Sequence, residues 1–333
     1  NSGKRSLRLD LKADGGRETF LELAAEADVF VENFRPGVVD RLGIGYDDVK
    51  AVNDGIVYCA ISGFGDDSEW SDRAAFDPML QGMTGLMSTT GEYHGDPVRI
   101  GVALIDITSG LWSAISVLGA LNRRHETGDG AFIDLRMYDV GVSLLTKKAA
   151  HYYREGEDPP RMGFASYGSH PYSGYPTADD EYIMVGAPFP AHWERFCAAI
   201  DREDLLTVER FETGDDRLEH REELDDILEE VFQQKPRDEW EQLFLDHELP
   251  VGPIHSIGEA LESEYTEANE IATEVEHPGY GSVRTLNLPL NVDGERQTFT
   301  TPPPTVGEHS REVLADLGVS ESAIDELEET GVI

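Results

Sequence analysis

The chain has 333 residues, of which 39% are hydrophobic and 9% aromatic, so it can bury a sizeable core in one large or two modest domains. Its 27 Lys and Arg residues stand against 66 Asp and Glu residues, a net charge of −39, which disfavours nucleic-acid binding through a general basic surface. No unbroken run of about eighteen apolar residues occurs, so we expect no transmembrane helix and no membrane partner.

The acidic residues are spread along the whole chain instead of forming an acidic tail, and only six of the basic residues are Lys. Such a surface repels itself at low ionic strength. At about 1 M salt the Debye length falls to about 3 Å, and this repulsion is screened. We therefore expect a protein adapted to a high-salt cytoplasm, with an ordinary acidic protein as the alternative.

Cys59 and Cys197 are the only cysteines, and the ten His residues are scattered. This pattern indicates neither a disulfide framework nor a zinc site, so no metal is expected. No secretory signal is present, which favours a cytoplasmic protein. Because the chain opens at Asn1 without a Met, we expect an N-terminal piece to be absent from this sequence.

Strand and helix patterns alternate through the first half of the chain. Residues 6–11 alternate with period two, which predicts a strand, and Asp14 is placed to cap the helix that follows. Further strands are predicted at 29–31, 56–61 and 132–135, and helices at 107–124 and 140–153. Such a succession of strands and helices favours parallel pairing, hence a doubly wound α/β sheet.

The composition changes after about residue 155. A Pro-containing linker at 155–160 precedes the stretch Gly163–Gly174, which is rich in Gly, Ser and Tyr. A strand at 182–185, a helix at 192–200 and charged amphipathic helix through 201–249 follow. These patterns predict a second, smaller α/β domain. A short helix is predicted at 310–317, near the end of the chain.

The segment Glu32–Gly37 follows a predicted strand and begins a helix with Pro in its first turn. Ligands of α/β proteins bind at the carboxyl edge of the sheet, and the N-terminus of a helix attracts phosphate. Arg35 and Arg41 would add positive charge there. An ordinary strand–helix turn with a surface Arg explains the pattern as well.

Asp106 precedes the predicted helix that begins at Ile107. It is either an N-cap carboxylate or a nucleophile that attacks an activated carbonyl. The stretch Gly163–Gly174 is either a mobile lid or a domain linker.

Short motifs in one order along the chain carry further information. They are Lys4–Leu7, Leu9–Lys12, Asp28–Val29, Glu32–Gly37, Arg41–Gly43, Ser62–Gly65, Arg73 with Phe76–Asp77, Thr127–Gly130 and Gly307–His309. Together they resemble the class III CoA-transferase family, to which formyl-CoA transferase and carnitine CoA-transferase belong. Chains of that family begin with an additional strand–helix unit that this sequence lacks.

The resemblance implies that Asp106 is a covalent nucleophile. It would attack a donor thioester to give a mixed anhydride, which the released CoA thiolate converts into an aspartyl-CoA thioester; the acceptor acid then reverses these steps. A CoA thioester is thus a substrate, and no permanently bound cofactor is implied. The CoA contacts carried over from the family are Leu9, Lys12, Asn33, Phe34, Arg35, Arg41 and Arg73. The closing loop of the family corresponds to Tyr167–His170.

The resemblance also implies a fold and an assembly. A large Rossmann-like, CoA-binding domain would comprise residues 1–160 and 255–333, and a small α/β domain residues 161–254. Family members form intertwined homodimers, so a homodimer is expected here.

Two other functions compete with CoA transfer. A CoA-ester racemase of the same fold needs acid/base groups, but Phe76 and Phe189 stand at the positions where the racemases have them. A non-catalytic CoA-binding protein would form no acyl-enzyme. For the transferase, our expected pair is succinyl-CoA with a C4–C5 dicarboxylate such as mesaconate, because Arg73 and Arg99 offer charge for a second carboxylate.

Overall fold

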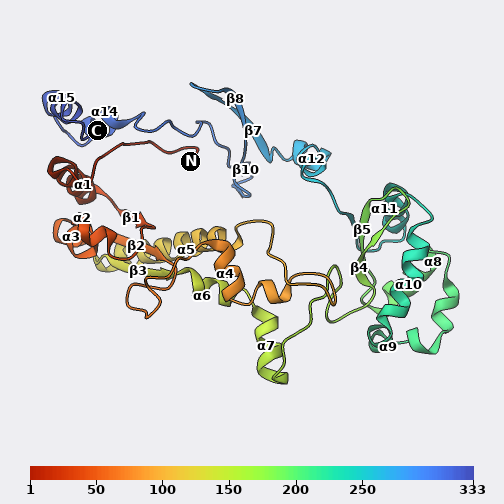
Figure 1. Cartoon of the computed structure of the whole chain (residues 1–333). Coiled ribbons are helices and arrows are strands. Elements are labelled where there is room, and N and C mark those ends of the chain that lie inside the picture. The colour runs from red at the N-terminus through yellow and green to blue at the C-terminus, as the bar shows by residue number, and fades with distance from the viewer. The chain divides into compact units, whose positions relative to one another are not determined.

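A computed structural model covers residues 1–333 and describes all of them except the side chain of Asp14. The capping role predicted for Asp14 therefore lies outside the described residues. The chain forms two compact units (Figure 1): a first unit of Asn1–Met87, Arg99–Tyr153 and Glu264–Ile333, and a second unit of Ser88–Val98 and Arg154–Ser263. The domain boundaries inferred at residues 160/161 and 254/255 stay a prediction.

A parallel three-stranded sheet organises the first unit. Its strands β1 (Val29–Glu32), β2 (Val57–Ser62) and β3 (Ala131–Arg136) lie in the order β1-β2-β3, with both pairs parallel. The connections between them contain α2 (Val38–Leu42), α3 (Tyr46–Val52), α4 (Asp77–Met83) and α5 (Leu104–Thr127), with a short 3₁₀ helix at Met87–Thr89. The mixed α/β fold with a parallel sheet is thus confirmed.

The central strand β2 explains why these elements pack together. Its apolar run is buried, with Tyr58 at 1% exposure and the free thiol of Cys59 fully enclosed, as expected for a strand covered on both faces. The ring of Phe30 on β1 lies edge-on to Tyr58 at 4.9 Å, and Phe20 of α1 (Asp14–Glu26) lies edge-on to Phe30 at 5.1 Å. These contacts attach α1 to the sheet.

The predicted strand at 6–11 is wrong: this segment forms neither strand nor helix. Its backbone N–H groups bond to the C-terminal part of the chain instead of to a neighbouring strand. Ser6 N donates to Nδ1 of His309 (3.2 Å), and Asp10 N donates to the carbonyl oxygen of Val332 (2.7 Å). The N-terminal segment therefore lies beside the C-terminal part of the chain in the first unit (Figure 1).

Other parts of the first unit also differ in detail from expectation. The helix predicted at 140–153 is two helices, because Thr146 takes a φ of 40° at their junction. The remaining elements are α6 (Met137–Ser143), α7 (Thr146–Glu155), α13 (Glu264–Ala268), the hairpin β7 (Ala272–His277) with β8 (Gly281–Leu286), the pair β9 (Asn291–Val292) with β10 (Glu295–Arg296), α14 (Ser310–Asp316) and α15 (Glu321–Glu329).

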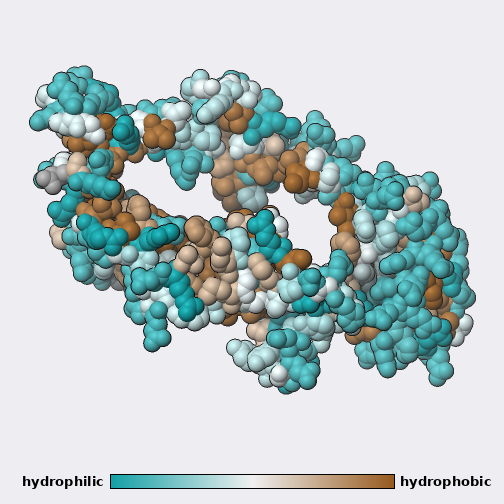
Figure 2. Space-filling view, viewed as in Figure 1, coloured by the Kyte–Doolittle hydropathy of each residue, from teal (hydrophilic) through white to brown (hydrophobic). Residues whose placement is uncertain are grey.

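Helix α5 carries an apolar stripe. By length and composition it could cross a membrane, because its Ser and Gly residues interrupt the apolar run without adding charge, but the core helix of a soluble protein passes the same test. The expectation of no transmembrane helix stays a prediction. The helix packs against β2, β3 and α6, but one face remains uncovered, and Figure 2 shows hydrophobic side chains over the position of this helix. The stripe consists of Ile107, Leu111, Ile115 and Leu118, each more than half exposed.

The second unit has its own sheet and core. The antiparallel sheet is β4 (Tyr172–Pro176), β5 (Tyr182–Gly186) and β6 (Val251–Pro253). The helices are α8 (Pro190–Ala199), α9 (Gly214–Glu219), α10 (Arg221–Phe232), α11 (Arg237–Asp246) and α12 (Ile257–Leu261), with 3₁₀ helices at Glu203–Thr207 and Glu209–Phe211. Stacked rings fill the core: Tyr175 lies on Phe232 at 4.8 Å, and Phe196 lies on Phe244 at 5.4 Å. The expected strand at 182–185 and helix at 192–200 are both present.

A buried polar cluster holds the end of the Tyr167–His170 segment within the second unit. Tyr175 donates from its hydroxyl to Oδ1 of Asp225 (2.8 Å), and Nε2 of His170 lies 3.3 Å from the same oxygen. Nε of the buried Arg217 donates to the carbonyl oxygen of His170 (3.0 Å). Burial raises the pKa of Asp225 to about 6 and lowers the pKa of His170 to about 3.

Candidate active site

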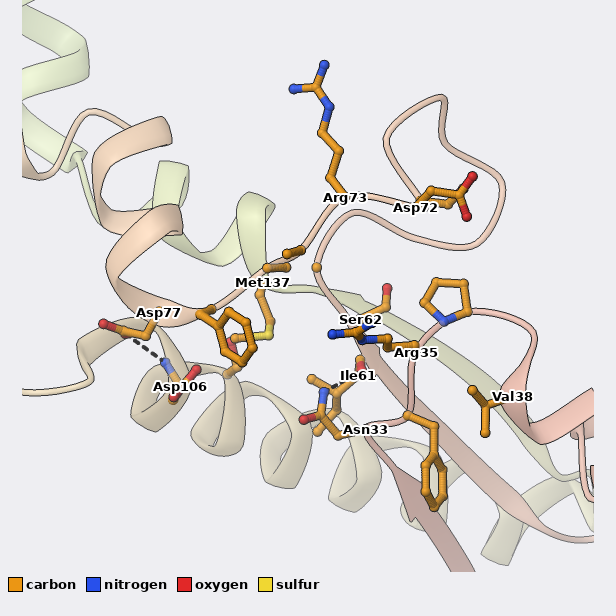
Figure 3. Close-up of a pocket in the computed structure, with 18 of the residues that line it drawn as sticks. Asn33, Arg35, Val38, Ile61, Ser62, Asp72, Arg73, Asp77, Asp106 and Met137 are labelled. Atoms are coloured by element: carbon orange, nitrogen blue, oxygen red, sulfur yellow. Dashed lines mark hydrogen bonds between the residues drawn. The ribbon is translucent and has the colours of Figure 1, made fainter. Parts of the chain in front are cut away.

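A cavity of about 900 Å³ opens at the carboxyl edge of the parallel sheet (Figure 3). Segments that follow β1 and β2, the residues that lead into α4, the first turns of α5, and Met137 directly after β3 form its walls. This edge is where open α/β sheets bind ligands. The site residues inferred from the sequence that line it are Asn33, Phe34, Arg35, Arg41, Arg73 and Asp106.

Leu9 and Lys12 lie outside this cavity. They belong to the irregular segment before α1, in which Leu9 is half-buried and Lys12 is exposed. The backbone N of Lys12 donates to Oδ1 of Asp10 (3.0 Å), and Asp10 N is bonded to Val332. The structure thus does not bring these two residues to the other site residues, and their contact with CoA stays a prediction.

The segment after β1 is held to the end of β2. Nδ2 of Asn33 donates to the carbonyl oxygen of Ile61 (2.6 Å), and Phe34 N donates to Oε2 of Glu32 (2.7 Å). Burial raises the pKa of the Glu32 carboxyl, an effect that the bond from Phe34 N opposes. The ring of Phe34 and the guanidinium of Arg35 remain exposed. This turn therefore presents an aromatic ring and a positive charge to the cavity.

The expected helix with Pro in its first turn is not present at this turn. Helix α2 begins at Val38, and Gly37 precedes it with a φ of 71°, in the left-handed region that favours glycine. Pro36 is therefore outside the helix. Because α2 has only five residues, its dipole adds little, and the positive charge here comes from the exposed side chains of Arg35 and Arg41.

Arg73 lies on the opposite side of the cavity and has an aromatic partner. Its guanidinium carbon is 4.1 Å from the ring centroid of Trp70, a cation–π contact. In Figure 3 the side chain extends away from Asp106 and Arg35. The segment that carries it passes close over β2, since a Cβ on Gly63 would lie 2.1 Å from Cβ of Ala75. A glycine at position 63 is therefore required for this wall.

Asp106 lies in the first turn of α5 and is not its N-cap, which corrects one of the two readings of this residue. The helix begins at Leu104, three residues earlier than expected, and Ala103 is the N-cap. Asp77 supplies the missing capping group: its Oδ2 accepts hydrogen bonds from Ile105 N (2.7 Å) and Asp106 N (3.3 Å) (Figure 3). Burial and the nearby charge of Asp77 raise the pKa of the Asp106 carboxyl.

The sequence alone did not indicate how two other residues contribute to this site. Asp77 was recognised only as part of a motif, and nothing local reveals that it caps a helix 28 residues away. Ser109 lines the cavity with its hydroxyl buried and without a hydrogen-bond partner. Its spacing of three residues from Asp106 places both on one face of α5, which is a signal that the sequence does contain. Phe76, at the position where racemases have a proton-transferring group, also lines the cavity and has no group that exchanges a proton.

Metal ligands and reactive thiols are not features of the described residues. Among the side chains that the structure describes, no group of three or more His, Cys, Asp or Glu could hold a metal ion. Both cysteines are buried and unpaired, and burial raises the pKa of Cys197 to about 12 and also raises that of Cys59. The site offers instead three carboxylates beside three guanidinium groups, those of Asp72, Asp77 and Asp106 and of Arg35, Arg41 and Arg73.

Residues 1–310 match the model of the CoA-transferase family III. The chain belongs to this family. As a member it is a CoA-transferase, in agreement with the resemblance of its motifs. The parallel sheet, the cavity at its edge and Asp106 within that cavity are consequently features of a CoA-transferase.

Named relatives and a solved structure agree with this assignment. The human succinyl-CoA:glutarate CoA-transferase is 33% identical over all of this chain and 76% of its own length. The succinyl-CoA:mesaconate CoA-transferase of Haloarcula hispanica is 31% identical over 96% of this chain and 81% of its own length. A crystal structure of a CAIB/BAIF family protein from Brucella suis superposes with a TM-score of 0.86 and 32% identity, covering 95% of this chain and 82% of that one.

Proposed function

We propose that this enzyme moves CoA from an acyl-CoA thioester to a carboxylic acid through a covalent thioester on Asp106. One observation carries the proposal: Asp106 lines the same cavity as Arg35 and Arg41. A carboxylate nucleophile needs an activated carbonyl, and the guanidinium groups supply charge for the phosphates of the molecule that carries it. CoA is both that carrier and the transferred group.

The reaction balances without any further reactant. An oxygen of Asp106 attacks the thioester carbonyl carbon, the C–S bond breaks, and CoA leaves as a thiolate. The thiolate then attacks the Asp106 carbonyl of the resulting anhydride, which releases the donor acid and forms the aspartyl-CoA thioester. The acceptor carboxylate attacks this thioester, its C–S bond breaks, and a second anhydride and the CoA thiolate result. Attack of the thiolate on the acceptor carbonyl completes the transfer and regenerates Asp106.

The raised pKa of Asp106 suits this role. A carboxylate that is disfavoured in its charged form, by burial first and by Asp77 second, is a more basic nucleophile than an ordinary aspartate. Exclusion of water around the anhydride and the thioester would prevent their hydrolysis.

For the substrates we propose succinyl-CoA as donor and a C4–C5 dicarboxylate as acceptor. Two relatives support this choice by name: one pairs succinyl-CoA with glutarate and the other pairs it with mesaconate. Arg73 in the cavity wall and the exposed Arg99 are positive groups in the first unit for a second carboxylate. The test is to supply succinyl-CoA with glutarate, mesaconate, oxalate and monocarboxylates of equal length, and to quantify each new thioester. Equal rates for monocarboxylates and dicarboxylates would contradict the proposal.

A second copy of this chain is the partner that we propose for the apolar stripe on α5. The stripe is too exposed for an isolated soluble subunit, since four large apolar side chains lie in one row on it. The helix that carries it has Asp106 in its first turn and packs against the sheet, which favours a protein surface over a lipid bilayer as its cover. The family resemblance adds the expectation of an intertwined homodimer.

We also propose that the enzyme works in a high-salt cytoplasm. Its net charge of −39 is the support, and a relative is found in Haloarcula hispanica. Melting temperatures in dilute buffer and in about 2 M KCl test this, because screening should stabilise the fold. Equal melting temperatures would exclude this adaptation.

The covalent intermediate itself can be trapped. Incubation of the wild-type enzyme with succinyl-CoA and then hydroxylamine should convert the activated Asp106 into a hydroxamate, and peptide mass spectrometry should locate the change at that residue. Inactivation should require the CoA donor. A racemase would instead exchange the α-proton of its substrate with solvent deuterium, and a passive binding protein would do neither.

A further inference from the structure

Asp77 is a buried carboxylate with three N–H donors around it. It is the first residue of α4, and its side chain is only 5% exposed. Oδ2 accepts from the backbone N–H groups of Ile105 and Asp106, and Oδ1 accepts from Nε2 of Gln81 (2.6 Å). Its oxygens are thus used within the protein, although the residue also lines the cavity.

Gln81 extends this contact to the chain that leads into α5. It lies one helical turn after Asp77 on α4 and is 1% exposed. Besides its bond to Asp77, Nε2 donates to the carbonyl oxygen of Val102 (3.2 Å), and Oε1 accepts from Ile100 N (2.9 Å). The nitrogen and the oxygen of the Gln81 amide therefore both bond to the segment before α5.

Helix α5 depends on this contact because it has no capping side chain of its own. Its N-cap is Ala103, which offers no acceptor to the N–H groups of the first turn. Two of these groups bond to Asp77, and one of them belongs to Asp106 itself. Without the carboxylate the first turn would lose its cap, and the orientation of Asp106 would no longer be fixed.

We propose that Asp77, supported by Gln81, is a positioning residue for the transfer reaction: it fixes the first turn of α5 and thereby the direction of the Asp106 carboxylate. This inference rests on the proposed role of Asp106 as the nucleophile. Asp77 forms no bond to the substrate in this reaction and transfers no proton. It acts through the backbone of Asp106.

The charge of Asp77 adds an effect that an uncharged cap would not have. Burial and then Asp77 raise the pKa of Asp106, and Asp77 is the one charged group that contributes to this shift among the described residues. The arginines 35, 41 and 73 line the same cavity. Asp106 attacks only when deprotonated, so the rate of adduct formation should rise with pH through its pKa. Removing the charge of Asp77 should move this rise to lower pH, while burial keeps it above the ordinary value.

The experiment measures the rate at which Asp106 acquires the hydroxylamine-trapped adduct from succinyl-CoA in a single turnover, across the acidic to neutral pH range. Asp77→Asn keeps the size of the side chain, but its amide has one acceptor oxygen where the carboxylate uses two. The adduct should form at least about tenfold more slowly, equivalent to about 1.4 kcal/mol, and the rise with pH should move to lower pH. Gln81→Met keeps the volume of residue 81 and leaves the charge of Asp77 in place. The adduct should therefore form more slowly, while the rise of its rate with pH stays at the wild-type pH.

A matched control is Asp48→Asn, which changes a carboxylate at the start of α3 that accepts from Gly45 N (3.1 Å) and lies outside the cavity. It should react as the wild type does. Wild-type rate and pH profile in Asp77→Asn would overturn this inference alone. If Asp77→Asn does not fold, a wild-type rate in Gln81→Met overturns it instead. Absence of any adduct in the wild type would overturn the proposed function, and this inference with it.

Discussion

Replacing Asp106 by Asn separates the catalytic role of this residue from its contribution to the stability of the fold. The amide has nearly the same shape as the carboxylate, but it is not a nucleophile towards a thioester, so neither the anhydride nor the aspartyl-CoA thioester can form. We expect kcat to fall by more than about 10³-fold, as for other enzymes that lose their nucleophile. The hydroxylamine-trapped adduct should disappear.

The stability of the variant should change little, for two opposing reasons. A carboxylate in the first turn of a helix stabilises it by about 0.3–1 kcal/mol through the helix dipole, and Asn loses this. The raised pKa of Asp106 shows that the fold disfavours its charge, and Asn relieves that strain. Because the side chain of Asp106 is only partly removed from solvent and its backbone N–H keeps its bond to Asp77, we expect the melting temperature to shift by less than about 4 °C.

Two assays decide the result: CoA transfer followed by chromatography of the thioesters, and thermal unfolding of the same preparations. Asp47→Asn is the matched control, since Asp47 is an exposed carboxylate in the first turn of α3 and lies outside the cavity. Asp106→Ala guards against slow deamidation of the introduced Asn. A folded Asp106→Ala enzyme with wild-type turnover would refute the mechanism.

Three further predictions test other parts of the molecule. Arg35→Gln and Arg41→Gln should each raise KM for the CoA donor by about tenfold to a hundredfold, from the loss of a charge-assisted contact, with KM for the free acid unchanged; an unchanged donor KM in both would place the phosphates elsewhere. Leu111→Glu puts a charge into the stripe of α5 and should convert a dimer into a monomer in light scattering, whereas a variant that stays dimeric would place the interface elsewhere. The pKa of Asp225 is raised from 3.8 to about 6, so the folded state binds this proton more tightly than the unfolded state and loses stability as pH rises through that range. This loss of unfolding free energy should be on the order of 1–3 kcal/mol, and Asp225→Asn should remove it. Urea unfolding at both ends of this pH range measures the unfolding free energy of the wild type minus that of the variant. A difference that is the same at both pH values would contradict the prediction.

The elements that the sequence predicted correctly are those whose pattern is local. β2 is a continuous apolar run because both faces of the strand are covered, so its burial is visible in the residues themselves. β1 and the apolar face of α1 were also visible as local patterns, although β1 lies at the edge of the sheet and Val31 on it is 50% exposed. The segment 6–11 has an equally good local pattern, yet its hydrogen bonds go to the C-terminal part of the chain. Period-two alternation indicates an extended segment but does not show whether a neighbouring strand exists.

The start of α5 shows a second limit. Local rules place an N-cap at a residue with a side-chain acceptor, and Asp106 is such a residue. The helix begins earlier because the acceptor comes from Asp77, on a different helix. A cap supplied across space leaves no trace in the sequence near the helix that it caps.

The motifs that carry the family resemblance acquire physical reasons at this cavity. Gly63 is needed because Ala75 passes too close for any side chain, and Gly37 because the chain takes a left-handed turn into α2. Asp77 is needed to cap the helix that presents Asp106. These residues come from separate parts of the sequence, but each of them shapes the same edge of the sheet. The family pattern is therefore more informative than any single motif, because it records contacts between segments that local propensities cannot express.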